Sequence, residues 1–142
     1  MPFSASSLLA EIRAAKRVYL IGNGGSYANA VHVCNDLLAC GVRAFVLDPA
    51  TLTATANDYG YEDVFKRWVG TVGESGDLLL AFSGSGRSPN ILAAVNEARR
   101  IGMKTYLVTD YLHSMDMQQS EENQLVLGHE IMRQLRRLRD GK

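Results

Sequence analysis

Short apolar runs alternate with amphipathic stretches along the whole chain. The apolar runs are rich in Val, Leu and aromatic residues, as strands buried on both faces are. They span residues 18–21, 43–47, 78–82 and 105–108. Around them, apolar residues recur at spacings of three and four, which predicts helices. These span residues 4–15 (with Ser4 as a candidate cap), 27–39, 61–72, 90–101 and 120–138. The alternation predicts a three-layer α/β fold, a parallel sheet of about four or five strands with helices on both faces.

Composition indicates the size of the domain and the partners that it lacks. A chain of 142 residues is the size of a single domain, here 1–142, and its 15 basic and 15 acidic residues give no net field for nucleic acid or an anionic membrane. Cys34 and Cys40 lie on one predicted helix about 240° apart, so they cannot form a disulfide with each other. With no leader-like segment and no apolar run of membrane-spanning length, we expect a cytoplasmic protein without a membrane or nucleic-acid partner.

Two glycine- and serine-rich turns follow predicted strands. "GNGGS" begins at Gly22 after the first strand, and "FSGSGRSPN" begins at Phe82 at the end of the third. The carboxyl ends of parallel strands meet at one edge of a sheet, where ligands bind. Pro89 after Ser88 predicts a helix start, whose free N–H groups attract anions, and Ser83, Ser85 and Ser88 add hydroxyl donors. This pattern favours a phosphate, although a plain turn with a capping serine has the same composition.

The first turn does not fit a nucleotide fingerprint. In a G-x-G-x-x-G frame from Gly22 the last position falls on Tyr27, and Asp48 comes too late to be the ribose-binding acid. No Gly-Lys-Ser/Thr follows the first turn, which excludes a P-loop. We therefore expect no nucleotide cofactor, and a smaller phosphorylated ligand instead.

Histidines and carboxylates are paired on two predicted helices. His32 and Asp36 are four residues apart and share a face; on the last helix Glu122 and His129, seven apart, do the same, with Glu121 beside them. Such pairs are either solvated surface contacts or parts of one acid–base or metal site. Spacing alone leaves both interpretations open.

Four stretches together carry a resemblance to a known family. They are "GNGGSYANAVH", "TATANDYGYEDVF", "AFSGSGRSPNIL" with "EARRIGMKT", and "SEENQLVLGH", in this order between residues 18 and 129. The chain resembles a sugar isomerase (SIS) domain and, within that family, the phosphoheptose isomerases, which interconvert sedoheptulose 7-phosphate and a heptose 7-phosphate. The resemblance implies a flavodoxin-like sheet and an aldose–ketose isomerisation through an enediol. The alternative is a non-catalytic SIS domain that senses a sugar phosphate.

The resemblance also implies roles for individual positions. The phosphate-binding serines correspond to Ser83, Ser85 and Ser88, and the turn that contacts the sugar corresponds to Asn23, Gly24 and Ser26. Asn57 and Asp58 correspond to a loop that faces the sugar. The positions that hold zinc in metal-containing members are His32, Asp36, Glu121 and His129, of which Asp36 is the base position and His129 the acid position.

This chain departs from the family pattern at three places. Asp36 stands where Glu is usual, and Glu121 stands where Gln is usual. The further strand usual in the family has no counterpart between the last apolar run and the last helix. Phosphoheptose isomerases assemble from several subunits, so the resemblance implies a homo-oligomer, either a dimer or a tetramer.

Overall fold

A parallel sheet of four strands forms the centre of the molecule. The computed structural model describes residues 5–109 and 116–141. Within these, the strands are β1 (Val18–Gly22), β2 (Ala44–Val46), β3 (Leu78–Phe82) and β4 (Lys104–Val108), in the order β2-β1-β3-β4. The parallel α/β fold and its four strands are confirmed, with ends that differ from the predicted ranges by at most one residue.

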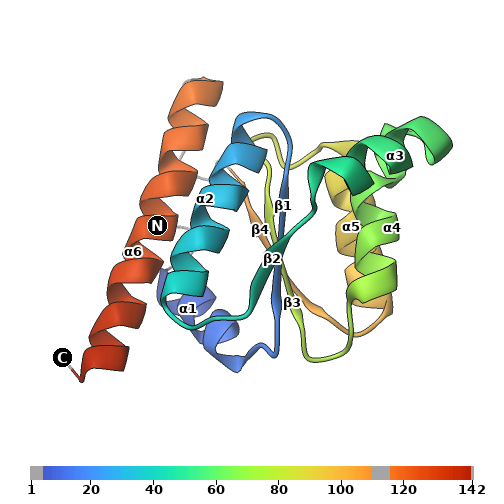
Figure 1. Cartoon of the computed structure of the whole chain (residues 1–142). Helices are drawn as coiled ribbons and strands as arrows, with labels where there is room; N and C mark the ends of the chain where they lie inside the picture. Colours follow the sequence, from blue (N-terminus) through green and yellow to red (C-terminus); the bar gives the residue numbers. More distant parts are fainter. Residues whose placement is uncertain (1–4, 110–115, 142) are drawn as a thin grey trace.

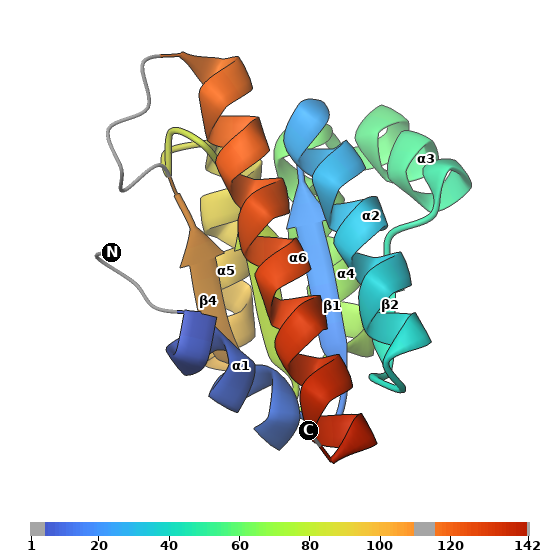
Figure 2. The same ribbon diagram turned by 90° about the vertical axis from the view of Figure 1, so that its left-hand side faces the viewer.

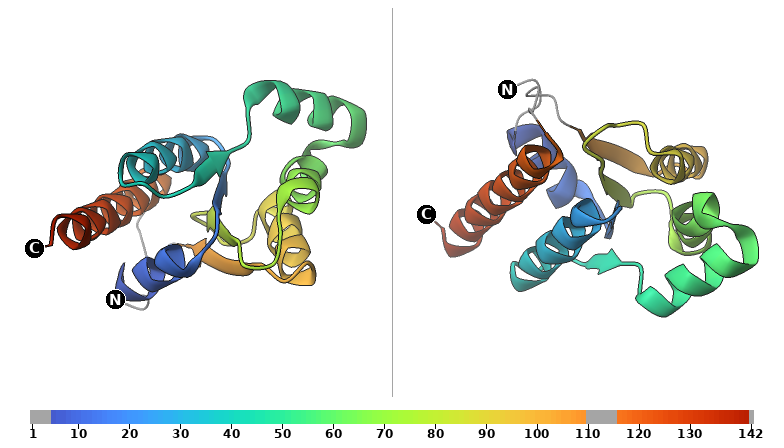
Figure 3. Two further views of the ribbon diagram at one scale, coloured as in Figure 1. Left: turned by 60° about the horizontal axis from the view of Figure 1, so that its bottom comes forward. Right: turned by 90° about the horizontal axis from the view of Figure 1, so that it is seen from above.

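Helices cover both faces of the sheet (Figures 1 and 3). One layer consists of α1 (Ala5–Ala14), α2 (Gly25–Ala39) and the long α6 (Met117–Asp140). The other contains α3 (Pro49–Tyr59), the 3₁₀ turn η1 (Tyr61–Asp63), α4 (Val64–Val72) and α5 (Pro89–Arg100). Figure 2 shows α6 running alongside α2 and across the end of α1. The cap expected at Ser4 lies outside the described residues.

The strand pleat divides the core into two halves. In β1, Val18 and Leu20 pack under α1, α2 and α6, whereas Tyr19 and Ile21 pack under α4 and α5. β1 and β3 are buried along their whole length, which explains why their sequences are unbroken apolar runs rather than alternating ones. None of the helices in the described ranges is long and apolar enough to cross a bilayer.

Helix α3 was not predicted from the sequence. Its sequence, PATLTATANDY, has small and hydroxyl side chains, and none of its residues is buried, so it lacks an apolar stripe. The helix starts because Pro49 fits its first turn and Asp48 caps it, accepting from Thr51 N at 2.9 Å. Asn57 and Asp58, expected in a loop, therefore lie in the last turn of a helix, where both are exposed.

Candidate functional site

The two glycine-rich turns meet at the carboxyl edge of the sheet. Gly22 at the end of β1 is in register with Phe82 at the end of β3, which places the turns side by side. Between them lies a pocket of about 250 Å³. Its lining residues are Asn23, Gly24, Gly25, Ser26, Phe82, Ser83, Gly84, Ser85, Ser88, Met117 and Glu121.

The serines of the second turn form one wall of this pocket. Ser83 Oγ accepts from Gly86 N at 3.1 Å and lies 3.5 Å from Ser88 Oγ, and Ser85 Oγ accepts from Arg87 N at 3.1 Å. Ser88 is the N-cap residue of α5, but its hydroxyl does not cap the helix. The start of α5 and the serine hydroxyls thus remain available to an anion.

Close backbone packing explains the glycines of the first turn. A Cβ at Gly22 would lie 2.6 Å from the carbonyl carbon of Ser26, and Gly24 has φ +54° as the N-cap residue of α2. Larger residues would collide at the first position and be strained at the second. Like α5, α2 has no side-chain cap of its own.

An amide pair joins the two turns. Asn23 Nδ2 donates to Asn90 Oδ1 and Asn90 Nδ2 donates to Asn23 Oδ1, both at 2.9 Å, and Tyr61 Oη donates to Asn23 Oδ1 at 2.9 Å. Asn23, expected to contact the sugar, thus uses its amide within the protein. Sequence reasoning assigned no role to Asn90 and Tyr61, although both lie inside the stretches that carry the family resemblance.

A second polar network fixes α6 against α2. Gln124 is buried and donates to Ser26 Oγ at 3.0 Å, while Asn29 Nδ2 donates to Gln124 Oε1 at 2.9 Å and to the Glu121 carbonyl oxygen at 2.8 Å. Ser26, another expected sugar contact, is buried in this network. Nothing in the sequence marks Asn29 or Gln124 beyond a polar residue on a helix.

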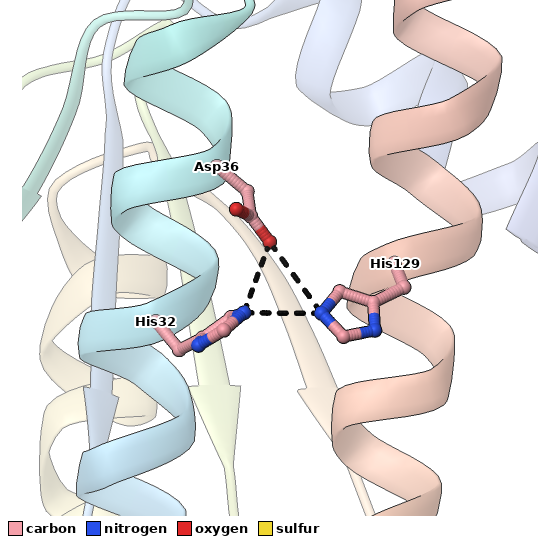
Figure 4. Close-up of side chains that lie close together, drawn as sticks. All are labelled: His32, Asp36 and His129. Carbon is pink, nitrogen blue, oxygen red and sulfur yellow. Dashed lines mark hydrogen bonds and ion pairs between the residues drawn. The ribbon is translucent and has the colours of Figure 1, made fainter.

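His32, Asp36 and His129 come together on α2 and α6 (Figure 4). The two Nε2 atoms are 3.0 Å apart, and Asp36 Oδ2 lies 3.4 Å from that of His32 and 3.9 Å from that of His129. Asp36 Oδ2 is buried and accepts no hydrogen bond. The histidines are partly exposed, so the cluster is open to ligands on its outer side.

Glu121 does not join this cluster. It precedes His129 by eight residues, about 12 Å along the helix, and its carboxylate lies against Gly25 in the pocket. Glu122 is exposed beside it, and Asn57 and Asp58 are not among the residues that line the pocket.

Two further ionisable groups near the site have structural explanations. Burial raises the pKa of the Cys34 thiol, so Cys34 is a core residue rather than a nucleophile. Burial, with the nearby Asp48 carboxylate, also raises the pKa of Tyr27, whose hydroxyl donates to the Leu47 carbonyl. Both Cys34 and Cys40 are free thiols, which confirms that they do not form a disulfide with each other.

Comparisons with known proteins show what this chain is similar to. The SIS domain family model matches residues 4–110. The phosphoheptose isomerase of Burkholderia pseudomallei (strain K96243) is 40% identical over 147 residues, which cover 88% of this chain and 75% of that protein. Two solved structures are similar at 27% identity. The phosphoheptose isomerase from Francisella tularensis has a TM-score of 0.84 over 94% of this chain and 84% of its own, and that from Neisseria gonorrhoeae has 0.82 over 92% and 82%.

Proposed function

The chain belongs to the SIS domain family, and from this membership and the site we propose that it is an aldose–ketose isomerase of phosphosugars, with sedoheptulose 7-phosphate as the substrate. The observation that carries the proposal is the cluster of His32, Asp36 and His129 on the same two helices that border the serine pocket. A serine pocket by itself only binds, whereas a carboxylate beside two imidazoles can also move protons.

In this proposal the serine turn anchors the phosphate. Ser83, Ser85 and Ser88 offer hydroxyls beside the uncapped start of α5. The distance from Gly25 to His32 along α2 is about 10 Å, which an extended seven-carbon sugar phosphate can span. The anchored phosphate would hold the carbonyl end of the sugar near the cluster, and such positioning accounts for a large part of a rate enhancement.

Asp36 and His129 then transfer the protons. Asp36 removes the proton from the carbon next to the carbonyl while His129 donates a proton to the carbonyl oxygen, which gives the enediol. The proton on Asp36 then returns to the former carbonyl carbon, and His129 takes a proton from the hydroxyl of the neighbouring carbon, which becomes the new carbonyl. The Oδ2 atom of Asp36 is buried and accepts no hydrogen bond, so it is free to take a proton. His32, 3.0 Å from His129, orients the second imidazole.

We also propose that the cluster can hold a zinc ion. In that state His129 and one Asp36 oxygen would be ligands, zinc would act on the substrate oxygens in place of His129, and the other Asp36 oxygen would take the proton. Two imidazole nitrogens and a carboxylate oxygen without a hydrogen-bond partner, all within 4.8 Å of one another, are the donor set zinc prefers. Three protein ligands leave one position for substrate, as in catalytic rather than structural zinc sites. Bound there, zinc would polarise the substrate oxygens. Equal zinc content in the wild type and in His129→Ala, measured by elemental analysis, would contradict this.

Two wider proposals accompany the activity. The protein acts as a homo-oligomer, a dimer or a tetramer, as the family resemblance implies. It acts in the cytoplasm, which its two free thiols suit.

Incubation with sedoheptulose 7-phosphate tests the activity. We expect NMR to show new anomeric signals of the aldose in the presence of zinc. Asp36→Asn removes the base and should abolish them, whereas Asp36→Glu restores the length usual in the family and should retain or raise the rate. A protein that binds the sugar phosphate but produces no aldose at high concentration would be a sensor rather than an isomerase.

A further inference from the structure

Glu121 alone is charged among the described residues that line the pocket. Arg87 belongs to the serine turn, but it lines a separate cleft between α4 and α5 together with Lys66 and Arg100. The pocket therefore offers a phosphate no cationic side chain from its described lining. Its favourable groups for an anion are hydroxyls and helix starts, and its one charge is negative.

The carboxylate of Glu121 lies at the start of α2. A methyl group at Gly25 would collide with both carboxylate oxygens, so the glycine leaves the space that the carboxylate occupies. A carboxylate at a helix N-terminus interacts favourably with the partial positive charge there. The start of α2 is thus already next to an anion, while the start of α5, beside the serines, has none.

The backbone of Glu121 is fixed in this position. Its own carbonyl oxygen accepts from Asn29 at 2.8 Å, and one turn further along α6 Gln124 is bonded to both Asn29 and the buried Ser26. These bonds hold the first turns of α6 against α2. The carboxylate on this fixed backbone lies against Gly25 and faces a ligand in the pocket as an acceptor.

We infer that Glu121 selects the substrate class, admitting phosphosugars that present hydroxyl or ammonium groups to it and rejecting those with a second anionic group. This inference rests on the proposed function, because it assumes that the phosphate binds at the serine turn. A ligand hydroxyl or ammonium donates to the carboxylate. A ligand carboxylate or second phosphate at the same place is repelled and finds no cation in the described lining to offset the repulsion. Ligands whose second anionic group lies within a few carbon atoms of the phosphate are thus excluded.

A matched pair of ligands tests the inference. 3-Phosphoglycerate and the glycerol phosphate of the same configuration at carbon 2 are both three-carbon monophosphates, and they differ only in a carboxylate or a CH₂OH at carbon 1. They are short enough to keep that group in the pocket near Glu121 when the phosphate lies at the serine turn. Calorimetric titration in the presence of a chelator keeps divalent cations from neutralising Glu121. For the wild type we expect the glycerol phosphate to bind at least about tenfold more tightly, the scale of one close charge pair at moderate dielectric.

Two variants assign the preference to one residue. Glu121→Gln keeps the shape of the side chain and should reduce the affinity ratio toward unity, mainly because 3-phosphoglycerate binds more tightly. Glu122→Gln removes the same charge from the exposed neighbouring position and should leave the ratio unchanged. Equal affinities in the wild type, or an unchanged ratio in Glu121→Gln, would overturn the selectivity while leaving the phosphosugar site intact. If neither ligand nor sedoheptulose 7-phosphate binds the wild type, the proposed function fails and the selectivity with it.

Discussion

Single hydroxyls decide how the pocket can hold a phosphate. The Oγ atoms of Ser83 and Ser88 lie 3.5 Å apart, and neither hydroxyl caps α5. This pairing was predictable, because a Ser-Gly turn before a Ser-Pro helix start is a local pattern. The contacts of Asn23 with Asn90 and Tyr61 were not, since they depend on how two distant turns approach in three dimensions. Hence two expected sugar contacts, Asn23 and Ser26, also have partners within the protein.

Replacing these serines should weaken ligand binding without unfolding the protein. We expect Ser88→Ala to lower the affinity for sedoheptulose 7-phosphate by about 1.5–3 kcal/mol, the range for a hydrogen bond to a charged group. Ser83→Ala should have a similar effect, with an additional contribution from the lost bond to Gly86 N. Calorimetry gives the affinity and circular dichroism the fold. Unchanged affinity in both variants would mean that the phosphate binds elsewhere.

Among the elements, α3 is the helix that hydrophobic periodicity could not predict. With no buried residue, the helix depends on its start, at Asp48 and Pro49. The strands and the other helices of the described ranges were predictable because each buries a face or both faces. The meeting of α2 and α6 was not predictable, and it brings His32 to His129. The separation of Glu121 from His129 follows from their spacing of eight residues on one helix.

The cap of α3 should make stability depend on pH. Hydrogen bonds from Thr51 hold the pKa of Asp48 below its usual value. Asp48 therefore contributes to stability at a pH above the pKa of an aspartate in the unfolded chain, about 3.9. This contribution is lost as the pH falls through the lower pKa that Asp48 has in the folded protein. Asp48→Ala should melt below the wild type at pH 7, and the gap should narrow in acid. Asp48→Asn keeps an accepting side chain and should stay close to the wild type at neutral pH.

The contact of α6 with α2 should not tolerate a methyl group at Gly128. A Cβ there would lie 2.5 Å from Val33 Cγ2 in the core. We expect Gly128→Ala to destabilise the protein by about 1–3 kcal/mol, as overpacking does, and to weaken zinc binding because it moves His129 away from His32. Gly70→Ala, on the exposed side of α4, is the control and should be neutral or stabilising. Urea denaturation gives both free energies of unfolding; equal values would contradict the close contact.

At the scale of the whole molecule, the layer of α2 and α6 leaves apolar side chains in solvent. Val126 is 62% exposed and Leu38 53%, with Val31 and Leu138 also exposed on these helices. The fold class and the ligand-binding edge of the sheet followed from strand–helix alternation, because every parallel sheet has such an edge. The exposed apolar face did not follow from the sequence, because hydrophobic periodicity cannot distinguish a buried apolar position from an exposed one.

We expect these residues to be covered by another copy of the chain. Light scattering should give the mass of a dimer or a tetramer, and Val126→Lys should lower it or make it depend on concentration, because a charge would be buried. Leu92→Lys, at a partly exposed position on α5 in the opposite layer, is the control and should leave the mass unchanged. A monomeric wild type at micromolar concentration would contradict the proposed assembly.

The reciprocal amide pair has a consequence for how the protein ages. Asn23 precedes Gly24, and the peptide nitrogen of an unhindered glycine readily attacks the preceding side-chain amide, expelling ammonia to form a succinimide that water opens to an aspartate or isoaspartate. In the folded chain both atoms of that amide are hydrogen-bonded to Asn90 and Tyr61, which keeps the group from rotating toward the backbone. Once converted, residue 23 would turn an acceptor toward the Asn90 oxygen and add a negative charge to the pocket. Storage under conditions that loosen the fold should therefore weaken phosphosugar binding, and the loss should accompany the small increase in mass that amide hydrolysis causes. The amide pair that aligns the two turns thus also determines how long the site stays intact.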